Sequence, residues 1–335
     1  MVSLAKVVGD DATRTRRYPV RRSINIYDLI PLLLFVILVG LIFVIKPRLL
    51  NPQFIEVKSN AGLTMILATV GQAFVLLSGG IDLSIGGVIS LTNSLAATQM
   101  QDTSQSVLLW VAIIVGIGLL AGLVNGLVVA VLRVAPFIAT LATWSILNGL
   151  ALLVLEDPGG KAAAPLKSFV RSDPLGIPNS LLAILILAGL WLLFKRSKWG
   201  TRLYAVGSEE ARSRLNGVNV VRVKVMAYML SGLFGALAGI YRTVEVSKGS
   251  PIAGDSFILT SAAAALVGGV ALGGGRGELI NAMLGGFIML FIFDLITFAG
   301  VSSFYTSMVQ GLFLIGAVSL NIVGSRARIR KALEQ

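Results

Sequence analysis

Residues 79–87 read Gly-Gly-Ile-Asp-Leu-Ser-Ile-Gly-Gly and lie between two apolar segments, residues 61–77 and 88–97. In lipid a carboxylate such as Asp82 costs about 3 kcal/mol unless it faces a bundle interior, a cavity or a partner. Glycines at such a place let two backbones approach closely, or break a helix where a pathway needs open backbone groups. The stretch therefore predicts a broken helix beside a solute pathway.

Composition places the whole chain in a membrane. Hydrophobic residues make up 56% of its 335 residues and charged residues only 13%, and the mean hydropathy is +0.87. Soluble domains carry about 25% charged residues. The 28 basic and 16 acidic residues give a net charge of +12. Since the bases cluster between apolar segments, they indicate membrane orientation and anionic lipid as a partner, with no nucleic acid.

Several chemistries are excluded by missing residues. The chain has no cysteine and no histidine, so it has no disulfide and no His/Cys metal site, and we expect neither a metal nor a cofactor. It contains no G-x-x-x-x-G-K-[ST] motif and hence no ATP-hydrolysing P-loop of its own. No catalytic set of side chains is recognisable, so the sequence does not predict an enzyme.

The apolar segments predict an all-α polytopic membrane protein with about ten transmembrane helices. They cover roughly residues 29–46, 61–78, 81–100, 107–131, 136–155, 180–194, 224–241, 257–273, 279–299 and 303–322. The glycine-rich residues 79–87 lie where the second segment gives way to the third, which leaves open whether that stretch is re-entrant. The predicted domains are an N-terminal arm (1–28), a transmembrane domain (29–322) with a polar loop (195–224), and a tail (323–335).

Basic residues predict the orientation. The arm, the loop 195–224 and the tail are all rich in Lys and Arg, and an even number of spans puts them on one side. The positive-inside rule makes that side cytoplasmic, so both termini are expected in the cytoplasm. Lys46, Arg48 and Lys58 fall on the other side and weaken the pattern without reversing it.

The loop 195–224 predicts a short cytoplasmic helix. Ser208 is the predicted N-cap, Glu209 and Glu210 lie in the first turn, and Asn216-Gly217 ends the helix. Such a helix between two spans is either a docking element for a soluble partner or an ordinary interfacial helix.

Polar residues inside the apolar segments mark a candidate pathway, although most are expected to form hydrogen bonds between helices. Asp82 either lines the pathway or caps the third span, with Ser84 among its expected donors. Asp294 lines the pathway, bonds a neighbouring helix or carries a proton. Small residues recur at every fourth position, as expected for close helix packing: Gly118, Gly122 and Gly126, and Ser231, Gly235 and Gly239.

Four segments in order carry a resemblance to a known family: GGIDLSIGG from Gly79, PFIATLATWSILNGLALL from Pro136, AVGSEEARSRLNGVNV from Ala205 and GGVALGGGRGELINAMLGG from Gly268. Over about residues 61–320 the chain resembles the membrane permease subunit of ribose-type ABC importers. It differs from the usual pattern at Asp294, where asparagine is common, and at Gln72, where methionine is common.

The resemblance implies a bacterial inner-membrane permease that forms a homodimer, binds cytoplasmic ATP-binding subunits and receives a monosaccharide or polyol from an extracytoplasmic sugar-binding protein. The expected pathway residues are Gly79, Gly80, Asp82, Ser84, Gly86, Asn93, Phe137, Thr140, Asn148 and Asp294. The expected ATPase-coupling residues are Gly207, Glu209, Glu210, Ala211, Arg212, Leu215 and Gly217. The alternatives are a branched-chain amino-acid permease and an ion-coupled secondary transporter that uses Asp82 and Asp294.

Overall fold

The computed structural model describes residues 26–47, 51, 53–300, 305, 308, 311, 312, 315, 316 and 319. The predicted arm, tail and last span (303–322) therefore lie almost entirely outside the described residues. The helices are α1 (Ile26–Ile45), α2 (Gln53–Leu77), α3 (Ser84–Gln99), α4 (Ser104–Ala130), α5 (Pro136–Val154), α6 (Ala164–Arg171), α7 (Asn179–Arg196), α8 (Lys198–Ser208), α9 (Glu210–Leu215), α10 (Val220–Val246), α11 (Asp255–Val267) and α12 (Leu279–Phe298). A 3-10 turn covers Pro174–Gly176.

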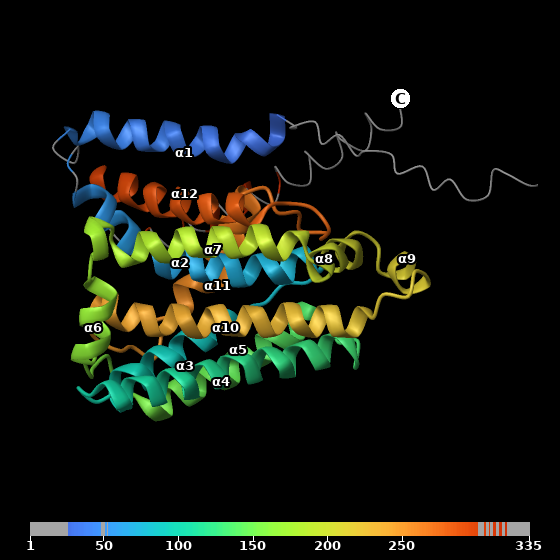
Figure 1. Cartoon of the computed structure of the whole chain (residues 1–335), viewed down its shortest axis with the longest axis horizontal. Helices are drawn as coiled ribbons and strands as arrows, with labels where there is room; N and C mark the ends of the chain where they lie inside the picture. Colours follow the sequence, from blue (N-terminus) through green and yellow to red (C-terminus); the bar gives the residue numbers. More distant parts are fainter. Residues whose placement is uncertain are drawn as a thin grey trace, which may run out of the picture.

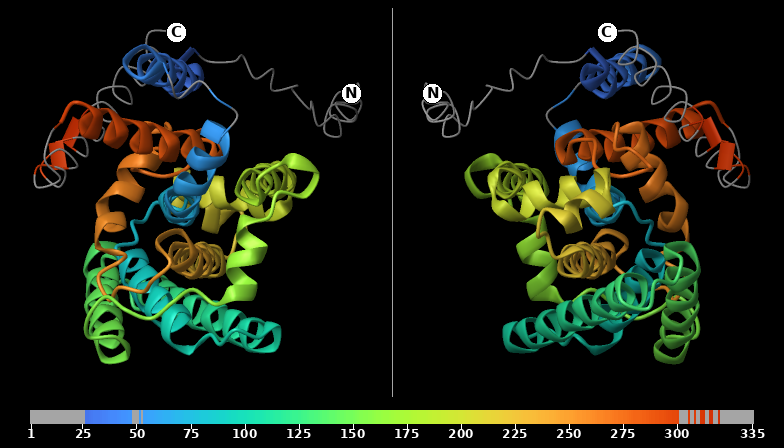
Figure 2. Two further views of the ribbon diagram at one scale, coloured as in Figure 1. Left: turned by 90° about the vertical axis from the view of Figure 1, so that its left-hand side faces the viewer. Right: turned by 90° about the vertical axis from the view of Figure 1, so that its right-hand side faces the viewer.

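The long helices run side by side, and shorter elements close the two ends (Figure 1). We name these ends after the short helices that lie there, the α6 end and the α9 end. Seen end on, α2 lies inside the bundle, whereas α1 lies on its outside next to α12 (Figure 2). Every residue of α2 from Gly62 to Leu77 is buried, as expected for a helix that is apolar on all sides.

Both stripes of small residues pack as predicted. A Cβ placed on Gly118 would lie 2.3 Å from the carbonyl oxygen of Gly232, and one on Gly122 would lie 2.2 Å from that of Tyr228. These contacts bring α4 against α10. On another side of α10, a Cβ on Gly239 would lie 1.9 Å from the Thr92 hydroxyl oxygen in α3. Glycine thus allows α10 to pack tightly between α3 and α4.

Six described helices are long and apolar enough to span a membrane: α2, α4, α5, α7, α10 and α12. The segments α1 and α11 are shorter apolar helices. All nine predicted spans before residue 300 contain a helix, but two of these helices are shorter than predicted. At 1.5 Å per residue, α3 is about 24 Å long and α11 about 20 Å, against a hydrocarbon core of about 30 Å.

Local signals shorten both helices. The third span begins at Ser84 rather than at residue 81, because the residues before it form the helix break. The span predicted over 257–273 ends at Val267, because Gly268 is its C-cap and Gly269 adopts a left-handed conformation with φ of +84°. A turn of residues 268–278 then leads into α12, so both short helices adjoin non-helical backbone.

Candidate functional site

The break between α2 and α3 is held by Asp82. This buried carboxylate accepts hydrogen bonds from the backbone N–H of Ser84 (2.9 Å) and from its hydroxyl (2.6 Å) through the same oxygen, Oδ1. The expected bonding of Asp82 to the start of the third span is confirmed. The backbone N–H of Leu83 donates to Thr140 Oγ1 at 3.0 Å, which ties the break to α5.

A directed chain of hydrogen bonds continues from Asp82 into two neighbouring helices. Asn125 Nδ2 of α4 donates to Ser84 Oγ at 2.7 Å, and Thr143 Oγ1 of α5 donates to Asn125 Oδ1 at 2.6 Å. The Asn125 side chain therefore has both a donor and an acceptor engaged. The prediction that intramembrane polar residues mostly join helices is confirmed for Asn125, Thr140 and Thr143.

Three segments that lie far apart in the sequence meet beside the break, each through at least one glycine. Gly275 N–H donates to the carbonyl oxygen of Leu77, the last residue of α2, at 3.0 Å. A Cβ on Gly207 would lie 1.8 Å from that same oxygen and 2.5 Å from the Gly275 nitrogen, and one on Gly274 would lie 2.8 Å from the Gly79 Cα. We call Gly79, Gly207, Gly274 and Gly275 the glycine junction.

Backbone conformation also requires glycine at this junction. Gly79, Gly274 and Gly275 have φ values of +85°, +80° and +66°, in the left-handed region that side chains disfavour. Gly207 instead needs glycine for space, because it is buried at the end of α8 against the backbone of α2. The junction therefore joins α8 directly to the helix break.

The short helix in the loop 195–224 is present as α9, but its predicted cap is wrong. Ser208 is the last residue of α8, and Glu209 takes the N-cap position without a side-chain capping bond. Ser208 fails as a cap because α8 extends through it and its hydroxyl donates to the Gly275 carbonyl oxygen at 3.4 Å. The predicted end is confirmed: Asn216 is the C-cap and Gly217 has a φ of +75°.

Glu210 fixes α9 to α10. Its carboxylate binds Arg214 Nη2 and Lys224 Nζ, each at 2.6 Å. The Lys224 ammonium holds the pKa of Glu210 below its usual range, although partial burial opposes this shift. By contrast, the Glu209–Arg212 pair is exposed and longer, at 3.2 Å, and Leu215 is 88% exposed. The tip of α9 thus presents an apolar side chain outward.

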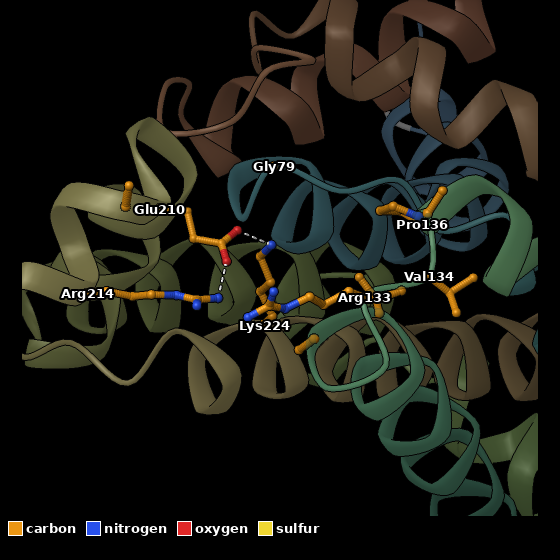
Figure 3. A pocket seen from close by; sticks show the side chains of 11 residues that line it. Gly79, Arg133, Val134, Pro136, Glu210, Arg214 and Lys224 are labelled. Atoms are coloured by element: carbon orange, nitrogen blue, oxygen red, sulfur yellow. Dashed lines mark hydrogen bonds and ion pairs between the residues drawn. The ribbon is translucent and has the colours of Figure 1, made fainter.

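A pocket of about 560 Å³ lies between α9 and the α4–α5 turn (Figure 3). Gly79 of the junction lines it together with Glu210, Ala211, Arg214 and Lys224, and Arg133 to Pro136 of the turn form the other wall. The structure therefore brings Gly79 of the predicted pathway set next to two residues of the predicted coupling set.

The remaining predicted pathway residues are dispersed. Gly80 packs against the Tyr228 hydroxyl, and Gly86 packs against Gly254 and Ile258 at the start of α11. Asn93 donates to Thr243 Oγ1 (2.8 Å) and accepts from Ser250 N–H (2.7 Å), so it joins α3 to the end of α10.

Phe137 is 54% exposed near the start of α5, and Asn148 has a buried Oδ1 without a hydrogen-bond partner among the described residues. The buried Gln72 amide also lacks a described partner.

Asp294 bonds a neighbouring helix, which was one of the alternatives for it. Its carboxylate pairs with Lys58 Nζ of α2 at 2.6 Å, and both side chains are mostly buried. About 28 Å of α2 separates Lys58 from Leu77, which adjoins the break. Asp294 and Asp82 therefore do not form one site.

Two features of the site were not predicted. Gly275 bonds the end of α2, and nothing in the sequence indicated this contact. A second polar cluster lies near the α6 end, where Glu245 accepts from Thr64 (2.6 Å) and pairs with Arg242 (2.8 Å). The only available signal was the run of glycines in the first case and the charged residues near a helix end in the second.

The fold and the site define a multi-pass membrane protein in which an exposed polar loop is joined to a broken intramembrane helix. Residues 58–318 match the family described as "Branched-chain amino acid transport system / permease component". The chain belongs to this family of permeases, so it is a transport component of the inner membrane and not an enzyme.

Individual relatives agree with this assignment. The chain is 36% identical to the ribose import permease protein RbsC of Bacillus subtilis (84% of this chain, 89% of the relative). It is 32% identical to RbsC of Escherichia coli K12 (86% and 91%), and 29% identical to the galactose/methyl galactoside import permease protein MglC of Haemophilus influenzae (85% and 91%). No solved structure matches the chain.

Proposed function

We propose that this chain is the permease subunit of an ABC importer for a monosaccharide or a related polyol. The relatives named as ribose and galactoside import permeases support this cargo, since each covers at least 84% of the chain. The family description mentions branched-chain amino acids, but the relatives cited above favour the sugar reading.

We place the α9 end in the cytoplasm. The loop 195–224 lies there and is rich in basic residues, as the positive-inside rule requires for a cytoplasmic loop: Lys195, Arg196, Lys198, Arg202, Arg212, Arg214, Arg222 and Lys224. The chain then crosses the membrane ten times between a cytoplasmic arm (1–28) and a cytoplasmic tail (323–335). The α6 end faces outward, where a sugar-binding protein delivers its ligand.

ATP-binding subunits dock on α9 in this proposal. The 88% exposed Leu215 supplies an apolar contact, while Glu210 keeps the helix fixed to α10. Closure of the ATP-binding subunits then moves α8 and α9 as a unit. Because the Gly207 backbone touches the end of α2, that movement reaches the break between α2 and α3 directly.

The translocation pathway passes the break, with Asp82, Ser84 and Thr140 holding its wall in place. We expect two copies of the chain to form this pathway together as a homodimer. The exposed apolar face of α5, which includes Ile146 and Leu153, leaves a surface for lipid or for a second copy.

An ion-coupled transporter that works alone is the rival function. It would bring Asp82 and Asp294 to one ion site, but the two lie near opposite ends of α2, and Asp294 already binds Lys58. The glycine junction is the observation that most favours an ABC importer. Through this junction the backbone of an exposed loop contacts the broken helix.

A double charge reversal tests the role of α9. Replacing Glu209 and Glu210 with lysine should abolish both uptake and co-purification of the ATP-binding subunit, while insertion into the membrane persists. Arg222→Glu, an exposed charge reversal on the same side, is the matched control and should retain both. Unchanged co-purification and uptake in the double variant would show that α9 is not the docking element.

A further inference from the structure

We propose that the pocket beside α9 receives an acidic side chain of the ATP-binding subunit and that Arg133 is its main anchor. This inference rests on the proposed function. It adds a second attachment point, on the α4–α5 turn, to docking at α9.

The pocket is a cationic recess. Three basic residues line it, namely Arg133, Arg214 and Lys224, against one acidic residue, Glu210. Formal charges therefore leave it with an excess of two positive charges. Its volume of about 560 Å³ is more than a carboxylate side chain needs.

Glu210 neutralises only part of the positive charge in the pocket. Its two oxygens already bind Arg214 and Lys224, one each. No carboxylate among the described residues pairs with Arg133, which lies in the opposite wall and is exposed to solvent. In Figure 3 the Arg133 side chain extends from the α4–α5 turn into the pocket. An incoming carboxylate can bind this guanidinium in a two-point geometry.

The backbone of Arg133 has a strained conformation. Its φ is +57°, in the left-handed region, which costs a residue with a Cβ about 1 kcal/mol or more. Among the described residues only Ser247 shares a positive φ without being glycine. Strain of this kind marks a position that the surrounding structure maintains.

A protein carboxylate is the occupant that the surroundings favour. The N-terminal arm carries five arginines in residues 14–22, so the recess repels it. Leu215 lies on the same short helix as the pocket residues Glu210, Ala211 and Arg214, and its 88% exposure adds an apolar anchor next to the charged recess. Apolar anchors combined with arginine are typical of protein–protein contacts.

The test compares two arginine reversals in the full chain, expressed with its ATP-binding subunit and reconstituted in nanodiscs of phosphatidylcholine alone. Arg133→Glu should weaken binding of the ATP-binding subunit about tenfold or more, whereas Arg222→Glu, outside the pocket, should leave it within about twofold. Equal thermal midpoints for both variants would show that folding is intact. An Asp→Arg or Glu→Arg change on the ATP-binding subunit should restore binding to the Arg133→Glu variant.

Three other outcomes would contradict the inference or the proposed function. Equal binding by wild type and Arg133→Glu overturns the inference and leaves docking at α9 standing. An effect of Arg133→Glu that appears only when phosphatidylglycerol is added to the nanodiscs assigns the recess to a lipid headgroup and also overturns it. A wild-type chain that binds no ATP-binding subunit at all contradicts the proposed function itself.

Discussion

Gly207 is the residue on which the proposed coupling depends most. A methyl group there would lie 1.8 Å from the Leu77 carbonyl oxygen, and both partners are backbone, so neither can move aside cheaply. We expect Gly207→Ala to separate α8 from the break, so that ATP hydrolysis continues while sugar uptake falls at least tenfold. The measurement is the ratio of sugar transported to ATP hydrolysed in proteoliposomes.

Gly189→Ala is the matched control for that experiment. Gly189 lies in α7, and a Cβ there meets no atom within 4 Å. Alanine also favours helix over glycine by about 1 kcal/mol, so the control should be neutral or slightly stabilised. Normal coupling in Gly207→Ala would show that the junction is only a place of close packing.

Asp82 gives a second prediction at the residue scale. Asparagine retains Oδ1 as an acceptor for Ser84, whereas leucine leaves the Ser84 N–H and the chain through Asn125 without their acceptor. We expect Asp82→Asn to retain much of the uptake, and Asp82→Leu to lose it together with about 1–3 kcal/mol of stability. Thermal midpoints and uptake at equal membrane levels measure this. Equal loss in both variants would mean that the charge itself is needed.

At the scale of the element, α9 is attached through one carboxylate. Because Lys224 lowers the pKa of Glu210, the folded protein holds this carboxylate ionised more readily than the unfolded chain does. Its stabilising effect is therefore complete above the ordinary value of 4.5 and is lost as the pH falls through the lowered pKa.

The lowered pKa of Glu210 predicts how the thermal stability of the protein depends on pH. The thermal midpoint of the wild type should exceed that of Glu210→Gln at pH 7, and the difference should shrink as the pH falls below about 4.5. Thermal unfolding in detergent at a series of pH values measures it. A difference that stays constant down to pH 3 would show that hydrogen-bond geometry, rather than charge, fixes α9 to α10.

The helices themselves followed from the sequence more closely than their ends did. Each of the nine segments that hydropathy predicted before residue 300 contains a helix, and the glycine stripes predicted the close packing of α10. The errors came from local backbone chemistry: Gly268 and Gly269 end α11 early, and α8 continues through Ser208. The preference of serine for the N-cap position predicted a helix start at Ser208. It could not show that the last turn of α8 would instead pack against α2.

The site was predicted only in part for a related reason. The sequence located Asp82 and its bond to Ser84, since both lie within three residues of each other. It left the role of Asp294 open, because the partner Lys58 is 236 positions away and only the fold brings the two together. The glycine junction likewise needs three segments to meet in space.

At the scale of the whole molecule, the two ends of the bundle have separate tasks in our account. The α9 end carries the basic loop, the charged pocket and the junction, and the α6 end carries the loops on the other side. The chain has no P-loop, and its relatives are import permeases, so in our account an ATP-binding partner supplies the energy for transport. The chain alone should therefore be inactive.

Uptake into proteoliposomes of the labelled monosaccharide or polyol that the sugar-binding protein binds tests this central claim most directly. The chain is reconstituted either alone, or with its ATP-binding subunit and sugar-binding protein. Our account predicts uptake only in the complete system, with ATP on the side of the membrane where the ATP-binding subunits lie. It predicts no uptake by the chain alone under a proton or sodium gradient. Gradient-driven uptake by the chain alone, at the rate of the complete system, would contradict it.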